Sequence, residues 1–149
     1  MKPGLVGVCA CLALLYLCHC SQAYVYGTLW CGRGTWAEDA MQLGSAVKTD
    51  MCCRRHDMCP YFIAGKSERF GLYNHRPYTI SSCRCDDRFK RCLEKAGTGT
   101  AQVTGTYFFD LFKTPCFELR MGKRCRRKTF WGSCLEWGRG MVGSIRQED

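Results

Sequence analysis

The segment TDMCCRRHDMCP, at positions 49–60, places three cysteines, a histidine and two aspartates within twelve residues, one of the aspartates directly after the histidine. Imidazole is the side chain best suited to act as a general base near neutral pH, and imidazole and thiolates are also the usual ligands of zinc. Three interpretations therefore compete for this segment: a metal site, a disulfide staple or a catalytic centre. The state of the cysteines in the rest of the chain decides between them.

The first 23 residues, MKPGLVGVCACLALLYLCHCSQA, resemble a secretory signal peptide cleaved after Ala23, because one lysine precedes an uncharged apolar run and small residues stand near the end. A transmembrane anchor is the alternative, but it needs about 20 apolar residues and flanking charges. Residues 24–149 are then expected to form a single extracellular domain with ten cysteines. An even number in an exported chain predicts disulfides, and oxidised cysteines cannot bind zinc. Any metal must therefore be held by oxygen.

Two helices are expected to position the segment. The first is predicted from Thr49 or Asp50, either of which could cap it, to about Cys59. The second is predicted from a serine cap within residues 81–82 to Gly97, since glycine commonly ends a helix. The remaining elements are less determined by the sequence.

Residues 60–80 contain several prolines and glycines and are expected to form an irregular connection. The stretch YFFDLFK, at 107–113, is apolar but too short for its periodicity to distinguish a strand from a helix. Two cysteines and many basic residues follow Cys116, which suggests a stapled hairpin or a pair of loops.

Cysteines recur at a spacing of seven on both predicted helices, and seven residues are nearly two helical turns. Two such helices side by side could be clamped twice, either antiparallel or parallel, and the spacing does not choose between these arrangements. The pairs are Cys52 with Cys59 and Cys85 with Cys92. In either arrangement His56 lies between the bridges and faces the helix that carries Asp86. A carboxylate beside an imidazole fixes its tautomer for general-base catalysis.

Asp57 follows His56 directly but projects about 100° away around a helix, so a different partner is expected for it. The glycine-rich stretch 30–34 could offer backbone carbonyl oxygens, and calcium prefers such oxygens together with a carboxylate. The alternative is that Gly32 and Gly34 only permit a turn. The other histidine after the leader, His75, is expected to be a solvated loop residue.

The chain is basic, with a net charge of +9, or +8 without the leader. A secreted basic protein encounters anionic lipid surfaces or glycans more readily than nucleic acid, and no nucleic-acid partner is expected. Residues 120–128, RMGKRCRRK, hold six basic side chains. They form either a solvated face or a contact with anionic headgroups, where Trp131 and Trp137 could enter the interface.

Three segments together resemble a known family. YGTLWCGRGT, TDMCCRRHDMCP and SSCRCDDRFKRCL are similar, in order and spacing, to the bee-venom type (group III) of secreted phospholipase A2, over about Tyr26 to Cys134. The resemblance implies a small, disulfide-rich, mainly α fold in which disulfides cross-link two long antiparallel helices. An N-terminal calcium-binding loop and a C-terminal stapled hairpin complete the implied architecture.

The resemblance also implies an activity: calcium-dependent hydrolysis of the sn-2 ester of glycerophospholipids by a monomer at an anionic membrane surface. His56 is implied as the general base that activates water, and Asp86 as the carboxylate that orients the imidazole. Asp57 and the backbone carbonyls of Trp30, Gly32 and Gly34 are the implied calcium ligands, with the Gly32 N–H helping to stabilise the oxyanion. The alternative is a toxin that binds a receptor or channel and does not depend on catalysis, or a protein that acts on membranes or heparin by charge alone.

Two further details follow from the resemblance. The implied bridges are Cys31–Cys53, Cys52–Cys92, Cys59–Cys85, Cys83–Cys116 and Cys125–Cys134. The family carries a tyrosine near the active site, expected eight residues before Cys116, but Phe108 occupies that position and Tyr107 lies one residue earlier. Either one residue is inserted or the hydroxyl is absent.

Overall fold

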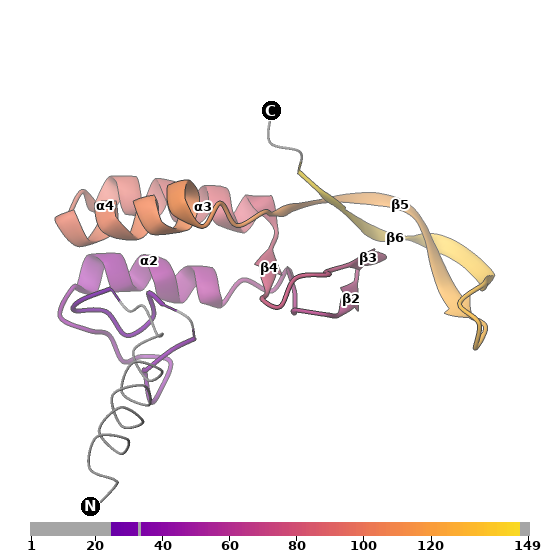
Figure 1. The fold of residues 1–149 in the computed structure, drawn as a ribbon, viewed down its shortest axis with the longest axis horizontal. Helices are drawn as coiled ribbons and strands as arrows, with labels where there is room; N and C mark the ends of the chain where they lie inside the picture. The colour runs from indigo at the N-terminus through magenta and orange to yellow at the C-terminus, as the bar shows by residue number, and fades with distance from the viewer. Residues whose placement is uncertain (1–24, 33, 147–149) are drawn as a thin grey trace, which may run out of the picture.

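The structure is a computed structural model that describes residues 25–32 and 34–146 (Figure 1). The predicted leader, residues 1–23, lies outside the described residues. No helix in the described part of the chain is long and apolar enough to cross a bilayer. In chain order the elements are α2 (Val47–Asp57), β1 (Phe62–Ile63), β2 (Glu68–Arg69), β3 (Leu72–Tyr73), β4 (Ile80–Ser81), α3 (Cys83–Ala96), α4 (Gly99–Gly105), the π-helix η1 (Thr106–Leu111), β5 (Phe117–Lys128) and β6 (Cys134–Ile145).

Helices α2 and α3 lie side by side and run in opposite directions, while β5 and β6 form a hairpin that extends away from them (Figure 1). The small disulfide-rich fold is confirmed, and the five bridges are those that the resemblance implied. The mainly α description holds only in part, because each hairpin strand is 12 residues long and matches the helices of 11 and 14 residues in length.

Helix α2 begins earlier than predicted and is not capped by a side chain. Its N-cap is Ala46, and Thr49 and Asp50 are buried within the first turn. The prediction that one of them caps the helix is wrong, because both side chains bond groups elsewhere: Thr49 Oγ1 lies 2.9 Å from Thr98 Oγ1, and Asp50 accepts backbone N–H groups of a distant loop. The helix ends at Asp57, two residues before Cys59.

Helix α3 ends where the sequence predicted, at Gly97, which adopts the left-handed conformation with φ of +62°. Ser82 occupies the N-cap position, but its side chain makes no capping bond. The backbone carbonyl of Ser82 instead accepts the N–H groups of Cys85 and Asp86. Ser81 lies in β4, so the preceding strand delivers its side chain to the first turn of α3.

The connection between α2 and α3 is more regular than predicted. Strand β1 pairs with β4, and β2 pairs with β3 between them, both antiparallel. A buried apolar cluster of Ile63, Phe70, Ile80 and Phe117 joins these strands to the base of the hairpin. The cluster therefore fixes β4, which carries Ser81, against the base of the hairpin.

A second apolar cluster lies between the helices and includes Trp30, Phe89, Leu93 and Ala101, together with three disulfide cysteines. The undecided stretch 107–113 falls largely in η1, so it is helical, and Phe108 and Phe109 pack against this cluster. Both clusters are small, and each disulfide adds roughly 2–4 kcal/mol by restricting the unfolded chain. Covalent bridges thus replace much of a hydrophobic core.

Candidate active site

His56 projects from α2 toward α3 and lies between the bridges Cys52–Cys92 and Cys59–Cys85. Its Nε2 is 2.7 Å from Oδ1 of Asp86, and both side chains are largely buried, at 14% and 7% exposure. The predicted pairing of imidazole and carboxylate is therefore confirmed as geometry. A carboxylate only accepts hydrogen bonds, so Nε2–H donates and the lone pair of the neutral ring lies on Nδ1.

Aromatic rings fix the orientation of the imidazole. Phe89 of α3 stacks on it with centroids 4.6 Å apart, and Phe108 of η1 meets it edge-on at 5.1 Å. The two phenylalanines also contact each other at 5.3 Å. Such packing excludes water from one side of the ring and limits its rotation.

Phe108 thus occupies the place next to the imidazole where the family pattern suggested a tyrosine. Tyr107 is 43% exposed, and its ring packs against Phe112 at 5.9 Å instead. Of the two alternatives left by the sequence, the structure selects the second: no tyrosine hydroxyl from this segment accompanies His56.

A hydroxyl that the sequence analysis missed is present at Ser81. Its Oγ donates a hydrogen bond to Asp86 Oδ1 and lies 3.2 Å from His56 Nε2. The sequence predicts Ser81 only as a candidate helix cap. Nothing in its sequence neighbourhood indicates this role, because the pairing of β4 with β1 turns the side chain toward the site.

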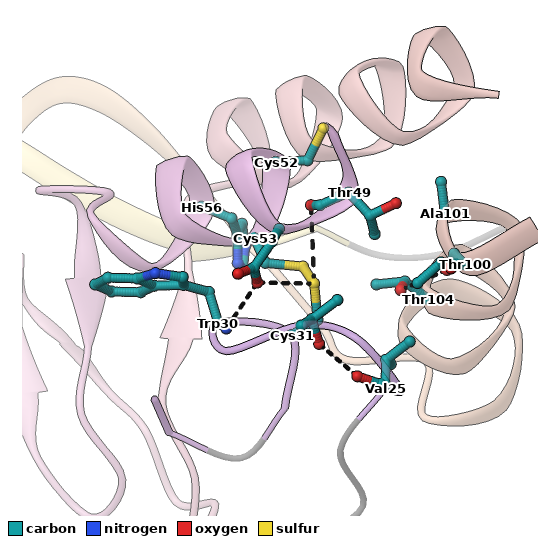
Figure 2. The surroundings of a disulfide bond; sticks show 12 residues. Val25, Trp30, Cys31, Thr49, Cys52, Cys53, His56, Thr100, Ala101 and Thr104 are labelled. Atoms are coloured by element: carbon teal, nitrogen blue, oxygen red, sulfur yellow. Dashed lines mark hydrogen bonds between the residues drawn. A yellow bond between two sulfur atoms is a disulfide. The ribbon is translucent and has the colours of Figure 1, made fainter. Parts of the chain in front are cut away.

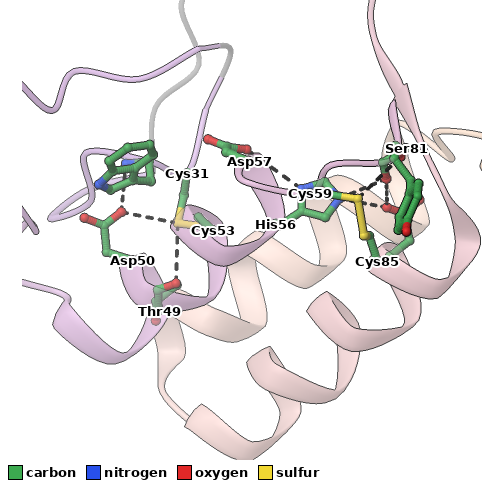
Figure 3. A network of polar contacts seen from close by, with 12 residues as sticks. Cys31, Thr49, Asp50, Cys53, His56, Asp57, Cys59, Ser81 and Cys85 are labelled. Atoms are coloured by element: carbon green, nitrogen blue, oxygen red, sulfur yellow. Dashed lines mark hydrogen bonds and ion pairs between the residues drawn. A yellow bond between two sulfur atoms is a disulfide. The ribbon is translucent and has the colours of Figure 1, made fainter. Parts of the chain in front are cut away.

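Asp57 lies on the other side of the imidazole from Ser81 (Figure 3). Its Oδ1 is 3.8 Å from His56 Nδ1, which is too long for a strong hydrogen bond, and its side chain is 36% exposed. Burial raises the pKa of Asp57, and the nearby charge of Asp50 acts in the same direction, while His56 acts against it. The negative charge of the Asp57 carboxylate is therefore poorly neutralised by the protein groups around it.

Burial of the imidazole lowers the pKa of His56, but Asp57 and Asp86 raise it further, to about 9. Below its unfolded value of 6.5, the protonated ring stabilises the folded state, and this contribution disappears as the pH rises through about 9. With calcium removed by a chelator, we expect His56→Gln to have a lower Tm than the wild type. This difference in Tm, measured by circular dichroism, should be larger at pH 6 than at pH 10. A difference that grows with pH would contradict this assignment.

Asp50 is the second functional residue that the sequence analysis missed. It is fully buried, and its carboxylate accepts backbone N–H groups of Leu29, Trp30 and Gly44 at 2.8–3.0 Å. The neighbouring bridge Cys31–Cys53 ties the same loop to α2 (Figure 2). The loop that carries the predicted calcium ligands is therefore anchored at the start of the helix that carries His56.

Replacing Asp50 with alanine leaves these buried donors without partners, at about 1–3 kcal/mol each. We expect Asp50→Ala to lower the free energy of unfolding by at least about 3 kcal/mol, measured by denaturant titration. Asp39→Ala is the matched control, because Asp39 also accepts two backbone N–H groups but is exposed, and about 1 kcal/mol is expected for it. Equal losses in the two variants would show that burial of Asp50 contributes nothing.

Asp57 is the carboxylate near His56 whose chemistry suits a calcium ion. No cluster of three or more side chains suited to a metal occurs in the part of the chain that the structure describes, so most ligands must come from the backbone. Among the three nearby carboxylates, Asp50 is satisfied by the loop and Asp86 by His56 and Ser81, which leaves Asp57 for a cation. A hard cation such as calcium binds carboxylate and backbone carbonyl oxygens together.

The loop itself holds Trp30, Gly32 and Gly34, while residue 33 lies outside the described part. The Trp30 indole donates to the Gln42 carbonyl at 2.8 Å, which fixes its side chain. The Gly32 N–H donates to the Trp30 carbonyl at 3.2 Å. To bind an oxyanion, the Gly32 N–H would therefore have to leave the Trp30 carbonyl and donate to the oxyanion instead.

Comparison with known proteins identifies the family to which the chain belongs. A family model described as phospholipase A2 matches residues 24–120. Phospholipase A2 isozymes PA3A/PA3B/PA5 of Heloderma suspectum are 47% identical over 110 residues, covering 74% of this chain and 77% of that protein. A phospholipase A2 of Bombus terrestris is 48% identical over 94 residues, 62% of this chain and 69% of that one. The Group 3 secretory phospholipase A2 of Homo sapiens is 39% identical over 112 residues, 75% of this chain but 22% of the human protein. The chain belongs to the phospholipase A2 family, in its bee-venom-like group III branch.

Proposed function

We propose that this protein hydrolyses the sn-2 ester of glycerophospholipids, releasing a fatty acid and a lysophospholipid. The observation that carries the proposal is the imidazole of His56, which donates through Nε2 to Asp86 and directs Nδ1 to the side where Asp57 lies. This is the arrangement of a base whose proton-accepting atom faces a cation-binding carboxylate. The names of the relatives agree with this activity.

In the proposed reaction Nδ1 of His56 takes a proton from a water molecule, whose oxygen attacks the sn-2 carbonyl carbon. Asp86 stabilises the imidazolium that forms, as an oriented carboxylate does in other hydrolases. His56 then returns the proton to the glycerol oxygen as the ester bond breaks. Phe89 and Phe108 keep the ring in one orientation throughout.

Asp57 and the carbonyls of Trp30, Gly32 and Gly34 are the proposed calcium ligands. Bound there, calcium supplies positive charge for the substrate phosphate and for the negative charge that develops on the carbonyl oxygen. Asp50 supports the set indirectly by holding the loop against α2. With one protein carboxylate, we expect a weak site, roughly 10⁻⁴ to 10⁻³ M.

We further propose that residues 1–23 are removed as a signal peptide and that residues 24–149 act outside the cell as a monomer on an anionic phospholipid surface. The five disulfides support an oxidising compartment. The strongly basic composition favours anionic lipid over neutral lipid.

The test uses vesicles of a phospholipid with different acyl chains at sn-1 and sn-2, with products identified by mass spectrometry. We expect release of the sn-2 chain alone in millimolar calcium and none in chelator. Release of the sn-1 chain, or equal release with and without calcium, would refute the proposed reaction.

A further inference from the structure

The β5–β6 hairpin carries most of the net positive charge of the protein. Residues 117–146 contain eight basic and two acidic side chains, against a net charge of +9 for the whole chain. The base of the hairpin packs on the body through Phe117, which pairs with Ile145. The far end extends away from helices α2 and α3 (Figure 1).

Two large aromatic side chains stand at the tip of this hairpin. Phe130 is 95% exposed and Trp131 is 88% exposed, and their rings meet edge to face with centroids 5.4 Å apart. They are the two central residues of the turn Thr129–Gly132, in which the Gly132 N–H donates to the Thr129 carbonyl. Exposed aromatic side chains of this size cost free energy in water, so a partner for the tip is indicated.

Hydrogen bonds within the tip close its turn. The Thr129 N–H donates to the Ser133 carbonyl at 2.8 Å, and the Ser133 N–H donates to Thr129 Oγ1 at 3.0 Å. The bridge Cys125–Cys134 closes the two strands just behind the turn. The tip is therefore a closed, cross-linked turn that can meet a partner surface without refolding.

Basic side chains surround the base of this tip. Arg127 and Lys128 have acidic partners, Glu136 at 3.8 Å and Glu68 at 2.9 Å. Lys123 lies over the Trp137 ring at 5.1 Å. The other basic side chains of the two strands form no ion pair with a carboxylate in the described part of the chain. They are Arg120, Arg124, Arg126 and Arg139.

We propose that the tip of the β5–β6 hairpin is a membrane anchor, in which Phe130 and Trp131 enter the headgroup region of an anionic bilayer and the flanking cations contact its phosphates. Aromatic side chains favour this depth, and each nearby cation adds roughly fivefold in affinity. An anionic glycan would account for the cations but not for the aromatic pair. A second protein copy would need a contact of about 800 Å² on each side, more than two side chains provide.

The anchor deepens the proposed function, because it supplies the membrane contact for that reaction, but it can be tested without catalysis. Binding to sedimented vesicles is measured for the inactive His56→Gln protein, with vesicles of phosphatidylcholine alone or mixed with phosphatidylglycerol. We expect binding to the anionic vesicles to fall at least about tenfold in Phe130→Ser/Trp131→Ser. Tyr26→Ser is the matched control, since Tyr26 is also 95% exposed, and wild-type affinity is expected for it.

Insertion is checked by tryptophan emission with brominated lipids. Quenching on vesicles is expected to disappear in Trp131→Phe and to persist in Trp36→Phe. Vesicle binding that is unchanged in the double variant, equal loss in Tyr26→Ser, or dissociation of a dimer by the double substitution would each overturn the anchor.

A separate assay distinguishes failure of the anchor from failure of the proposed function. Hydrolysis of a short-chain phospholipid dispersed below its micelle concentration does not need a membrane contact. The double variant with native His56 is expected to match the wild type in this assay and to lose activity only on vesicles. Absence of hydrolysis in the wild type would refute the proposed reaction and leave the binding result standing.

A second inference rests on a different observation, the hydroxyl of Ser81. Ser81 Oγ and His56 Nε2 share one oxygen of the Asp86 carboxylate, and the two donors lie 3.2 Å apart. Ser81 is 8% exposed and is held by the pairing of Ser81 with Phe62 across two strands. We infer that Ser81 is a positioning residue that fixes the Asp86 carboxylate in the rotamer that His56 requires.

Ser81→Ala is expected to lower kcat on dispersed substrate about tenfold or more with KM nearly unchanged, and Ser81→Thr to restore most of it. The Nε2 proton of His56, observed by NMR in chelator, should shift upfield in Ser81→Ala and return in Ser81→Thr. Ser82→Ala is the matched control, because this equally buried neighbour does not contact the carboxylate. An unchanged proton resonance, or equal losses in Ser81→Ala and Ser82→Ala, would overturn the assignment.

Discussion

Replacing His56 with glutamine is expected to lower kcat/KM for release of the sn-2 fatty acid by about 10²–10⁴-fold, the usual contribution of a general base. Glutamine has nearly the volume of histidine and its amide can still donate to Asp86, so the contacts with Phe89 and Phe108 are largely kept. In saturating calcium, where the charge of Asp57 no longer favours the imidazolium, the loss should therefore appear in kcat rather than in the Tm. The measurement is steady-state hydrolysis in saturating calcium, with thermal unfolding recorded for the same preparation.

His75→Gln is the matched control for this substitution. His75 lies in the connection between the helices, where its ring meets Tyr73 at 4.6 Å, and it takes no part in the site. Wild-type activity is expected for this variant. If His56→Gln kept its effect on cells or membranes in full while fatty-acid release disappeared, the biological effect would be that of a receptor- or channel-binding toxin. Full hydrolysis in His56→Gln would refute the role of the imidazole itself.

The part of the site that lies on regular helices could be predicted from the sequence. Cysteine pairs at a spacing of seven define one face of each helix, and any double clamp places His56 opposite the residue next to Cys85. This local geometry does not depend on the direction of the second helix, which the spacing left open. Gly97 likewise ends α3 because of its own backbone freedom, a property of the residue rather than of its surroundings.

The residues that the sequence did not reveal act through distant parts of the chain. Asp50 looks like an ordinary helix cap, yet its partners lie 20 residues earlier and six residues earlier. Ser81 also looks like a cap, yet the pairing of β4 with β1 makes it part of the site. Side chains that form hydrogen bonds locally compete with tertiary partners, and only the folded arrangement decides which partner binds.

The covalent framework explains how a chain with two small apolar clusters can hold a catalytic geometry. Three of the five bridges have a cysteine in or directly after α2, and His56 lies among them. Catalytic groups need positions fixed within a fraction of an ångström, and packing alone supplies this poorly at the surface of a small domain. The hairpin, by contrast, has one bridge of its own and little contact with the helices, which suits an element that meets a membrane.

Replacing Asp57 with asparagine is expected to weaken calcium binding at least about tenfold and to lower hydrolysis at millimolar calcium at least about a hundredfold. Asparagine preserves the shape of the side chain and removes the charge that the backbone carbonyls cannot supply. Calorimetry of calcium binding gives the first value and vesicle hydrolysis the second. Asp110→Asn removes a carboxylate from an exposed position on η1 and should change neither.

The same substitution has an expected effect in the absence of calcium. Asp57 is one of the two carboxylates that raise the pKa of His56 to about 9, so Asp57→Asn should lower that pKa, as followed by NMR of the imidazole in chelator. Calcium added to the wild type should shift it in the same direction, because a cation at Asp57 cancels the charge that favours the imidazolium. A neutral base at extracellular pH would then depend on the metal as well as on the protein. A calcium titration that leaves the His56 pKa unchanged would place the ion away from Asp57 and would remove the basis for the proposed ligand set.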